Sequence, residues 1–283
     1  KELEVQEKVM APKAILASIS AAKDQMLSPQ DVLRNAAGDY KEEVIAKVYD
    51  FYQKRLKAAN ALDFDDIIIF TVKLFQQFPD ILEKYRNRFR YIMVDEYQDT
   101  NNSQFLLVSL LAGGHNNICV VGDDDQSIYK FRGATIENIL NFENQYRNTK
   151  VIRLEQNYRC TQTILDAANA VIEHNTQRKG KTLWTQNPKG NQVKVYRALS
   201  EQDEARFIAD TILDDVAKGQ KFSDHAILYR MNAQSNTLEN ALIRSGIAYK
   251  IVGGQRFYDR KEIKDILAYL KTIANGRDGL AVQ

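Results

Sequence analysis

Two short apolar runs, each followed by acidic residues, stand in the middle of the sequence. Residues Tyr91–Val94 and Ile118–Val121 are apolar throughout; Asp95–Glu96 follow the first run directly, and Asp123–Gln126 follow the second after Gly122. A strand of a parallel sheet is buried on both faces, so it reads as an unbroken apolar run. Functional groups of such sheets lie just past the carboxyl ends of the strands. The pattern therefore predicts a parallel sheet with two acidic clusters at one edge.

The remaining pattern alternates between helix-like and strand-like segments, after an N-terminal stretch that is helical throughout. Residues 1–60 and 62–89 carry apolar side chains at helical spacing, with Ser28 and Asp63 as N-caps. Further helices are expected around 104–111, 136–146, 163–173, 201–218, 237–244 and 261–274. Further strands are expected at 151–154, 193–196, 226–229 and 249–252. Strands that alternate with helices predict parallel α/β layers.

Composition narrows the class of protein. The chain has 283 residues, 44% hydrophobic and 27% charged, which is typical of a globular protein and favours two domains. Its net charge is only +2, so a nucleic-acid site would have to be a local basic patch. Cys119 and Cys160 offer neither a disulfide framework nor metal-ligand spacing, and Cys119 is expected to be inert core. No apolar run approaches a membrane span, and a reducing, cytoplasmic location fits.

Several polar clusters allow a plain structural interpretation beside a functional one. The pair Asp95–Glu96 could be a solvated turn, or a site where one carboxylate holds Mg²⁺ and the other orients a water. The acidic cluster Asp63–Asp66 is better explained by helix capping than by a metal. Basic residues along 41–57 could form a solvated face or contact nucleic acid. Residues Gly180–Thr182 have the ending of a phosphate-binding loop, but Asn175 stands where that loop needs glycine, and a helix precedes the segment.

Three blocks in chain order carry a family resemblance. They are Asp-Glu-Tyr-Gln-Asp-Thr at 95–100, Gly-Asp-Asp-Asp-Gln-Ser-Ile-Tyr at 122–129 and Leu-Glu-Gln-Asn-Tyr-Arg at 154–159. These blocks resemble motifs II, III and IV of superfamily 1 DNA helicases of the PcrA/UvrD/Rep group, the PcrA branch in particular. The match extends to residues 62–66, 230–235 and 251–265.

The resemblance implies an α/β, P-loop NTPase helicase fold with parts of two RecA-like parallel-sheet domains and an N-terminal helical subdomain. Residues 1–62 would be the helical 1B-like subdomain, 63–148 the C-terminal part of RecA-like domain 1A, and 149–275 the N-terminal part of RecA-like domain 2A. Residues 276–283 would be a tail near the start of a 2B subdomain. No stretch of the chain matches the phosphate-binding loop of the family, so we expect an internal fragment of a longer protein.

The resemblance also implies roles for residues at a nucleotide site. Asp95 would bind Mg²⁺ largely through water, and Glu96 would position the attacking water. Gln126 would reach the γ-phosphate, and Tyr158 would stack on the adenine. Arg159 would act on the γ-phosphate as an arginine finger, although a surface salt bridge is the simpler alternative for an arginine.

The implied DNA contacts begin with the aromatic and basic residues Tyr129, Phe131 and Arg132. Single strands are held by aromatic stacking and by charges that follow the phosphates. Relatives often carry Trp at the position of Phe131, so this platform offers less stacking surface, and Phe131 alone would also suit a core. Arg230 and Asn232 would contact the same strand from the second domain.

The function implied is an ATP-dependent 3′→5′ DNA helicase and translocase of replication or repair. Its cofactors would be ATP and Mg²⁺, and its partners single-stranded DNA, single/double-strand junctions, and repair or replication proteins, without a membrane. One alternative is a helicase subunit of a nuclease complex or an RNA-acting relative. Another is a DNA- or partner-binding fragment without catalysis, because the isolated chain lacks the Walker A loop.

Overall fold

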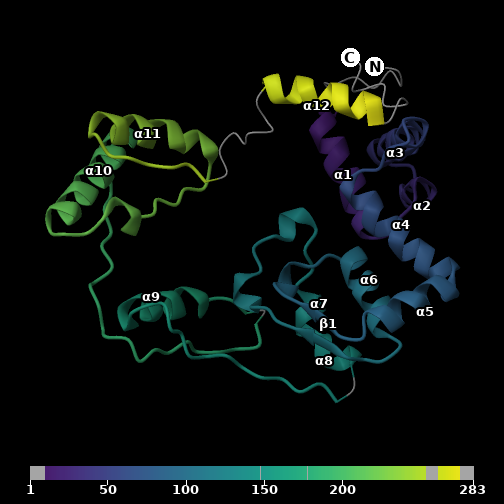
Figure 1. Ribbon diagram of the computed structural model, residues 1–283, viewed down its shortest axis with the longest axis horizontal. Helices are drawn as coiled ribbons and strands as arrows, with labels where there is room; N and C mark the ends of the chain where they lie inside the picture. The colour runs from purple at the N-terminus through teal and green to yellow at the C-terminus, as the bar shows by residue number, and fades with distance from the viewer. Residues whose placement is uncertain (1–9, 147, 177, 253–260, 275–283) are drawn as a thin grey trace. The chain divides into compact units, whose positions relative to one another are not determined.

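The computed structural model describes residues 10–146, 148–176, 178–252 and 261–274 (Figure 1). The tail 276–283 and the glycines 253–254 of the sequence match therefore lie outside the described residues. The chain divides into two compact units, residues 1–190 with 268–283, and residues 191–267. This division falls at Gly190, and the predicted subdomain boundary near 148 stays a prediction.

The first unit begins with five helices: α1 (Pro12–Asp24), α2 (Pro29–Asn35), α3 (Tyr40–Ala58), α4 (Phe64–Gln77) and α5 (Pro79–Arg88). Both predicted N-caps are confirmed. The Ser28 hydroxyl accepts a hydrogen bond from the Asp31 N–H, and Asp63 accepts one from the Asp66 N–H. Helices α1–α3 enclose a core of aliphatic residues and one tyrosine, namely Ile15, Ile19, Ala22, Val32, Ile45, Ala46 and Tyr49. The predicted helical stretch 62–89 is interrupted at Phe78, because Pro79 starts a new helix.

A buried lysine joins α1 to α4. The Lys23 side chain is 0% exposed, and its Nζ lies 2.5 Å from Asp63 Oδ2 and 2.8 Å from Asp66 Oδ1. The Tyr52 ring centroid lies 5.2 Å from the same ammonium group. A buried charge is tolerated only when it is paired and hydrogen-bonded. The acidic cluster at the start of α4 therefore serves capping and this ion pair, in agreement with the structural interpretation of the sequence.

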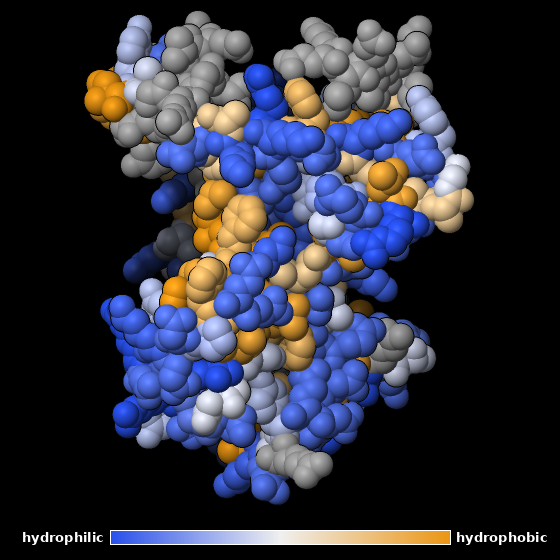
Figure 2. Space-filling model, turned by 90° about the vertical axis from the view of Figure 1, so that its right-hand side faces the viewer, coloured by the Kyte–Doolittle hydropathy of each residue, from blue (hydrophilic) through white to orange (hydrophobic). Residues whose placement is uncertain are grey.

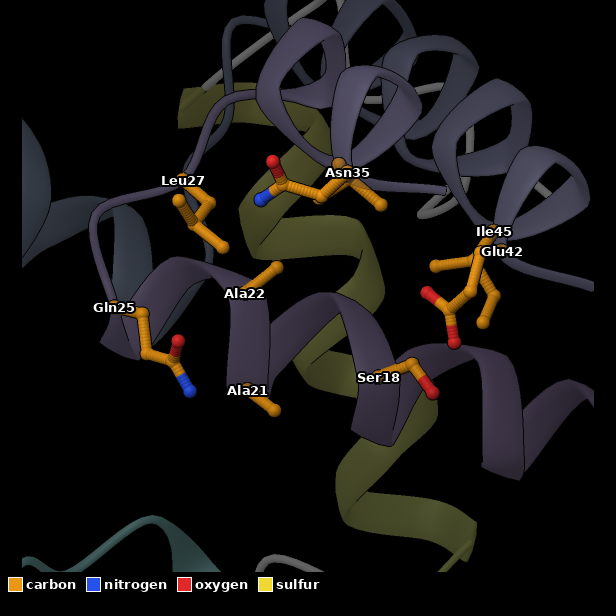
Figure 3. Close-up of a pocket in the computed structure, with 9 residues that line it drawn as sticks. Ser18, Ala21, Ala22, Gln25, Leu27, Asn35, Glu42 and Ile45 are labelled. Atoms are coloured by element: carbon orange, nitrogen blue, oxygen red, sulfur yellow. The ribbon is translucent and has the colours of Figure 1, made fainter. Parts of the chain in front are cut away.

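A pocket of about 320 Å³ lies between α1, α2 and α3 (Figure 3). Ala22, Leu27 and Ile45 supply apolar lining, while Gln25 and Glu42 bring polar groups. The basic residues of α3 are exposed, as a solvated face requires: Lys41, Lys47, Lys54, Arg55 and Lys57.

The two predicted central strands form a two-stranded parallel sheet. Strand β1 (Ile92–Val94) pairs with β2 (Ile118–Val120), and Met93 lies opposite Cys119. The expectation of burial on both faces is wrong, because Met93 is 78% exposed and Cys119 is exposed too. Alternate residues of a strand point to opposite faces. Met93 and Cys119 point to the face that the described elements leave open, so Cys119 is not core.

The first unit also contains helices α6 (Asn102–Ala112), α7 (Glu137–Leu140) and α8 (Phe142–Gln145), with 3-10 turns η1 (Tyr97–Asp99), η2 (Asp124–Gln126) and η3 (Lys130–Arg132). Helix α9 (Gln162–Ile172) follows later in the unit. The second unit holds α10 (Glu201–Ala217) and α11 (Ser235–Arg244), with turns η4 (Phe222–Asp224) and η5 (Asn232–Gln234). These two helices share a small core of Ala209, Ile212, Leu242 and Ile247. Helix α12 (Lys261–Ala274) is the last described element.

The four later strands expected from the sequence do not form in the described residues. Residues 151–154, 193–196, 226–229 and 249–252 have no strand assignment, and an isolated bridge joins Gln156 to Trp184. A strand needs a neighbour that satisfies its N–H and C=O groups. These segments have none in the described chain, and their apolar side chains, such as Leu228 and Val195, are exposed. The sequence therefore predicts more strands than the described chain forms, and the structure is mostly helical.

Apolar side chains also reach the surface elsewhere. Figure 2 shows one face on which hydrophobic patches interrupt a largely hydrophilic surface. Among the described residues, no helix is both long enough and apolar enough to cross a membrane.

Candidate functional site

The carboxyl end of β1 presents the first acidic pair. Asp95 and Glu96 follow Val94 and are both exposed. Asp95 Oδ1 accepts a hydrogen bond of 2.9 Å from the Glu96 N–H. Glu96 has φ 49° and ψ 42°, a left-handed conformation that is uncommon for a residue other than glycine. The turn therefore holds two exposed carboxylates on neighbouring residues at the carboxyl end of β1.

A buried glutamine connects this turn to the end of β2. Gln98 is 1% exposed, and its Nε2 donates a 2.8 Å hydrogen bond to Glu96 Oε2. Its Oε1 accepts a 2.9 Å hydrogen bond from the Asp123 N–H. A Cβ on Gly122 would lie 2.6 Å from Gln98 Oε1, so the chain can approach this closely only because residue 122 is glycine.

Asp123 continues the network on the β2 side. Its Oδ2 accepts a 2.7 Å hydrogen bond from Gln126 Nε2, and its Oδ1 accepts one from Lys181 Nζ. Burial alone would raise the pKa of Asp123, but the hydrogen bonds from Lys181 and Gln126 outweigh burial and hold the pKa below its ordinary value. Glu96 and Gln126, both selected from the sequence, are thus linked through Gln98 and Asp123.

A basic segment covers the three consecutive aspartates. Arg178 binds Asp125 through two hydrogen bonds of 2.8 and 2.7 Å, and the Lys179 N–H donates to Asp124 over 2.7 Å. The three carboxylates lie within 4.8 Å of one another, a spacing that could hold a metal ion. Here, however, the cations of Arg178 and Lys181 already pair with them. Asp95 has no cationic partner in the described chain, so it is the better candidate for Mg²⁺, which prefers one or two carboxylates and several waters.

An aromatic and cationic cluster follows Gln126 after two intervening residues. The ring centroids of Tyr129 and Phe131 lie 6.0 Å apart, and the Arg132 guanidinium lies 5.2 and 5.5 Å from them. Phe131 is 69% exposed, which excludes the alternative that it belongs to the core. The cluster combines a stacking surface with positive charge, which is the combination that holds single-stranded nucleic acids.

The remaining sequence-selected residues are exposed, and Tyr158 and Arg159 form no hydrogen bond or ion pair with this network within the described residues. Tyr158 is 80% exposed and donates to Gln156 Oε1 over 3.0 Å. The Arg159 side chain is exposed and, within the described chain, forms no ion pair, so the salt-bridge alternative is not realised there. Arg230 and Asn232 are exposed residues of the second unit, and their contact with DNA stays a prediction.

Comparison with known proteins decides the family. The family model of the UvrD/REP helicase N-terminal domain matches residues 1–147, and that of the UvrD-like helicase C-terminal domain matches residues 152–283. The chain belongs to the UvrD/REP helicase family. ATP-dependent DNA helicase PcrA of Staphylococcus epidermidis strain RP62A is 50% identical over 279 residues, 99% of this chain. PcrA of Staphylococcus aureus strain Mu50 gives the same identity and coverage. The chain spans 38% of the length of these curated relatives.

Membership of the UvrD/REP family confirms the resemblance drawn from the motifs at 95–100, 122–129 and 154–159. Sequence reasoning missed three residues that organise the site, namely Gln98, Arg178 and Lys181. The charges offered a signal for the last two, because three successive aspartates need cations nearby and the segment Arg178–Lys181 supplies them. The sequence around Lys181 points only to an incomplete phosphate-binding loop, Gly180–Thr182.

Proposed function

We propose that this chain is part of an ATP-dependent DNA helicase that moves 3′→5′ along single-stranded DNA. The observation that carries the proposal is the hydrogen-bonded link from Glu96 to Gln126, with the Tyr129–Arg132 cluster three residues farther on. A nucleotide site and a nucleic-acid platform would then share one short loop. The C-terminal part of one RecA-like domain at 63–148, the N-terminal part of a second at 149–275, and the helical subdomain 1–62 belong to this proposal.

At the nucleotide site, Asp95 would hold Mg²⁺ through water, and the ion would neutralise charge on the phosphates. The exposed Asp95 carboxylate fits this role because only one of its oxygens, Oδ1, accepts a hydrogen bond in the described chain. Glu96 would orient the attacking water and accept its proton. Gln126 and Arg159 would contact the γ-phosphate, and Tyr158 would cover the adenine.

On the nucleic-acid side, Tyr129 and Phe131 would stack with bases of a single strand while Arg132 contacts phosphate. Arg230 and Asn232 would contact the same strand from the second unit. Base stacking on aromatic residues contributes ~1–3 kcal/mol per base, with little dependence on sequence. A role in replication or repair, and partners among repair or replication proteins, follow from the family alone.

The test is ATP hydrolysis with and without single-stranded DNA, on the 283-residue chain and on the full-length protein that contains it. The full-length protein should hydrolyse ATP in a Mg²⁺-dependent, DNA-stimulated reaction. The isolated chain should not, because hydrolysis in this class needs backbone amides and a lysine around the phosphates, and the chain has no such loop. Stimulated turnover by the isolated chain would refute its predicted inactivity, and an inactive full-length protein would refute the helicase proposal.

A further inference from the structure

The Gln98 side chain uses both ends of its amide between the two strand ends. Its NH₂ group donates to Glu96 over 2.8 Å, and its oxygen accepts from the Asp123 N–H over 2.9 Å. A weaker contact of 3.4 Å joins the same NH₂ group to Asp99. Because Gln98 is 1% exposed, water cannot replace these partners without opening the structure.

Only a side chain with a donor and an acceptor at its tip can make this bridge. A glutamine amide provides both, whereas a glutamate provides acceptors alone and a methionine provides neither of comparable strength. The close approach of Gly122 to the Gln98 oxygen fixes the amide from the β2 side. The bridge is therefore specific in chemistry as well as in length.

The bridge connects Glu96 and, through Asp123, Gln126, which are two residues that the proposed mechanism uses. The Glu96 carboxylate accepts a hydrogen bond from Gln98 Nε2. On the other side, the Asp123 N–H donates to Gln98 Oε1, and the Asp123 carboxylate accepts from Gln126 Nε2. Lys181 holds the other oxygen of Asp123. A change in the position of Gln126 would pass to Glu96 through two residues, both with restricted freedom.

We propose that Gln98 is a positioning residue for ATP hydrolysis, which holds the Glu96 carboxylate in register with the loop that carries Gln126. The inference rests on the proposed function, since it takes Glu96 and Gln126 as groups that act on water and phosphate. Gln98 itself does not touch the nucleotide. It acts by limiting where the Glu96 carboxylate lies when the water attacks.

The experiment compares Gln98→Met and Gln98→Glu with the wild type in the full-length protein. Methionine has similar volume without the hydrogen bonds, and glutamate keeps the acceptor for Asp123 but loses the donor to Glu96. Misplacement of a catalytic group by about 1 Å can lower a rate ~100-fold. We therefore expect kcat to fall ~10–100-fold in both variants, while the KM for ATP and single-strand affinity change less than about threefold.

A matched control tests the same chemical change at another hydrogen-bonded glutamine. Gln104 accepts a hydrogen bond from the Asn101 N–H at the start of α6 and lies outside the proposed machinery. Gln104→Met should lower thermal stability slightly and leave kcat unchanged. Equal losses of kcat in the Gln98 and Gln104 variants would assign Gln98 a purely structural role and overturn the proposal.

A double variant decides whether Gln98 acts through Glu96. Glu96→Gln alone should bind nucleotide and lower single-turnover hydrolysis to a slow but measurable rate, because an amide cannot accept the proton. In that background Gln98→Met should cause no further loss. Two losses that multiply, or a Gln98 effect confined to the KM for ATP, would overturn the inference. A wild-type protein without DNA-stimulated hydrolysis would instead refute the proposed function.

Discussion

Replacement of the exposed Arg159 can show whether its guanidinium contacts ATP mainly in the transition state or already in the ground state. If it acts as an arginine finger, Arg159→Ala in the full-length protein should lower kcat by ~10³–10⁵ and change ATP affinity far less. Single-turnover hydrolysis and equilibrium nucleotide binding measure the two effects separately. Arg206→Ala, at an exposed arginine paired with Asp203 on α10, is the matched control and should change neither. A loss confined to affinity would make Arg159 a ground-state ligand.

Gln126 and Phe131 are five residues apart, and their substitution by alanine should impair different activities. Phe131→Ala removes an exposed stacking surface, so single-strand affinity should fall by ~1–3 kcal/mol with basal ATPase nearly unchanged. Gln126→Ala removes the hydrogen bond to Asp123 and should leave strand binding intact while DNA stimulation of ATPase falls. Strand affinity, basal ATPase and stimulated ATPase of both variants decide the matter. Identical profiles for the two variants would make the loop a structural element only.

Among the elements, the contact between α1 and α4 depends on one buried cation. Lys23→Met would leave the carboxylates of Asp63 and Asp66 without their ammonium partner, and breaking a buried ion pair in this way costs ~3–5 kcal/mol. The free energy of unfolding from denaturant titration measures the loss. Lys13→Met, at an exposed position of the same helix, should lie within ~0.5 kcal/mol of the wild type. A small effect at Lys23 would show that the carboxylates find other partners.

Helices of this chain are predictable from sequence because their signals are local. Ser28 and Asp63 cap α2 and α4 as expected, and the glycine after α6 ends that helix. Strands depend on a partner that can lie far away in sequence, and the strand-like segments at 151–154 and 226–229 have none in the described chain. The runs at 92–94 and 118–120 do form strands, because each is the partner of the other and α6 connects them.

At the scale of the whole chain, stability should depend on pH through Asp24. Burial, and then the nearby charge of Asp65, raise the pKa of Asp24 from 3.8 to about 6. Between these two values the folded chain holds the proton more tightly than the unfolded chain, so stability falls as pH rises from about 4 to 6. Asp24→Asn, which can still accept from Asn101, should unfold like the wild type near pH 4. At pH 7 it should be ~1–3 kcal/mol more stable in denaturant titrations.

Asp31 should make stability depend on pH in the opposite direction from Asp24, in the same denaturant titrations. Hydrogen bonds from the Ser28 hydroxyl and N–H hold the pKa of Asp31 below its ordinary value, with Arg34 contributing. Its stabilising effect is therefore present above the unfolded pKa and is lost on acidification. Asp31→Asn should lower stability at pH 7, with the difference shrinking toward low pH. The same slope for Asp24→Asn and Asp31→Asn would contradict one of the two assignments, and its sign would show which.

The sequence motifs of the site were predictable, whereas the residues that hold those motifs in place, Gln98, Arg178 and Lys181, were not. Asp95 and Glu96 stand directly after one apolar run and Gln126 stands in the polar segment after the other, so the ends of the strands point to all three. Nothing in Asp-Glu-Tyr-Gln-Asp-Thr distinguishes the buried Gln98 from the exposed Asp95 and Glu96, because burial of Gln98 depends on how the loop after β2 folds back. The cover of Asp123–Asp125 by Arg178 and Lys181 likewise joins segments more than fifty residues apart.

The left-handed backbone of Glu96 has a consequence for anyone who evolves this protein in the laboratory. A left-handed conformation costs a residue with a Cβ roughly 1–2 kcal/mol, which glycine avoids and asparagine partly avoids. A library selected for thermostability alone would therefore favour Gly or Asn at position 96. Each would remove the carboxylate. Selection for heat resistance and selection for turnover would then move this position in opposite directions, so a screen needs both pressures at once.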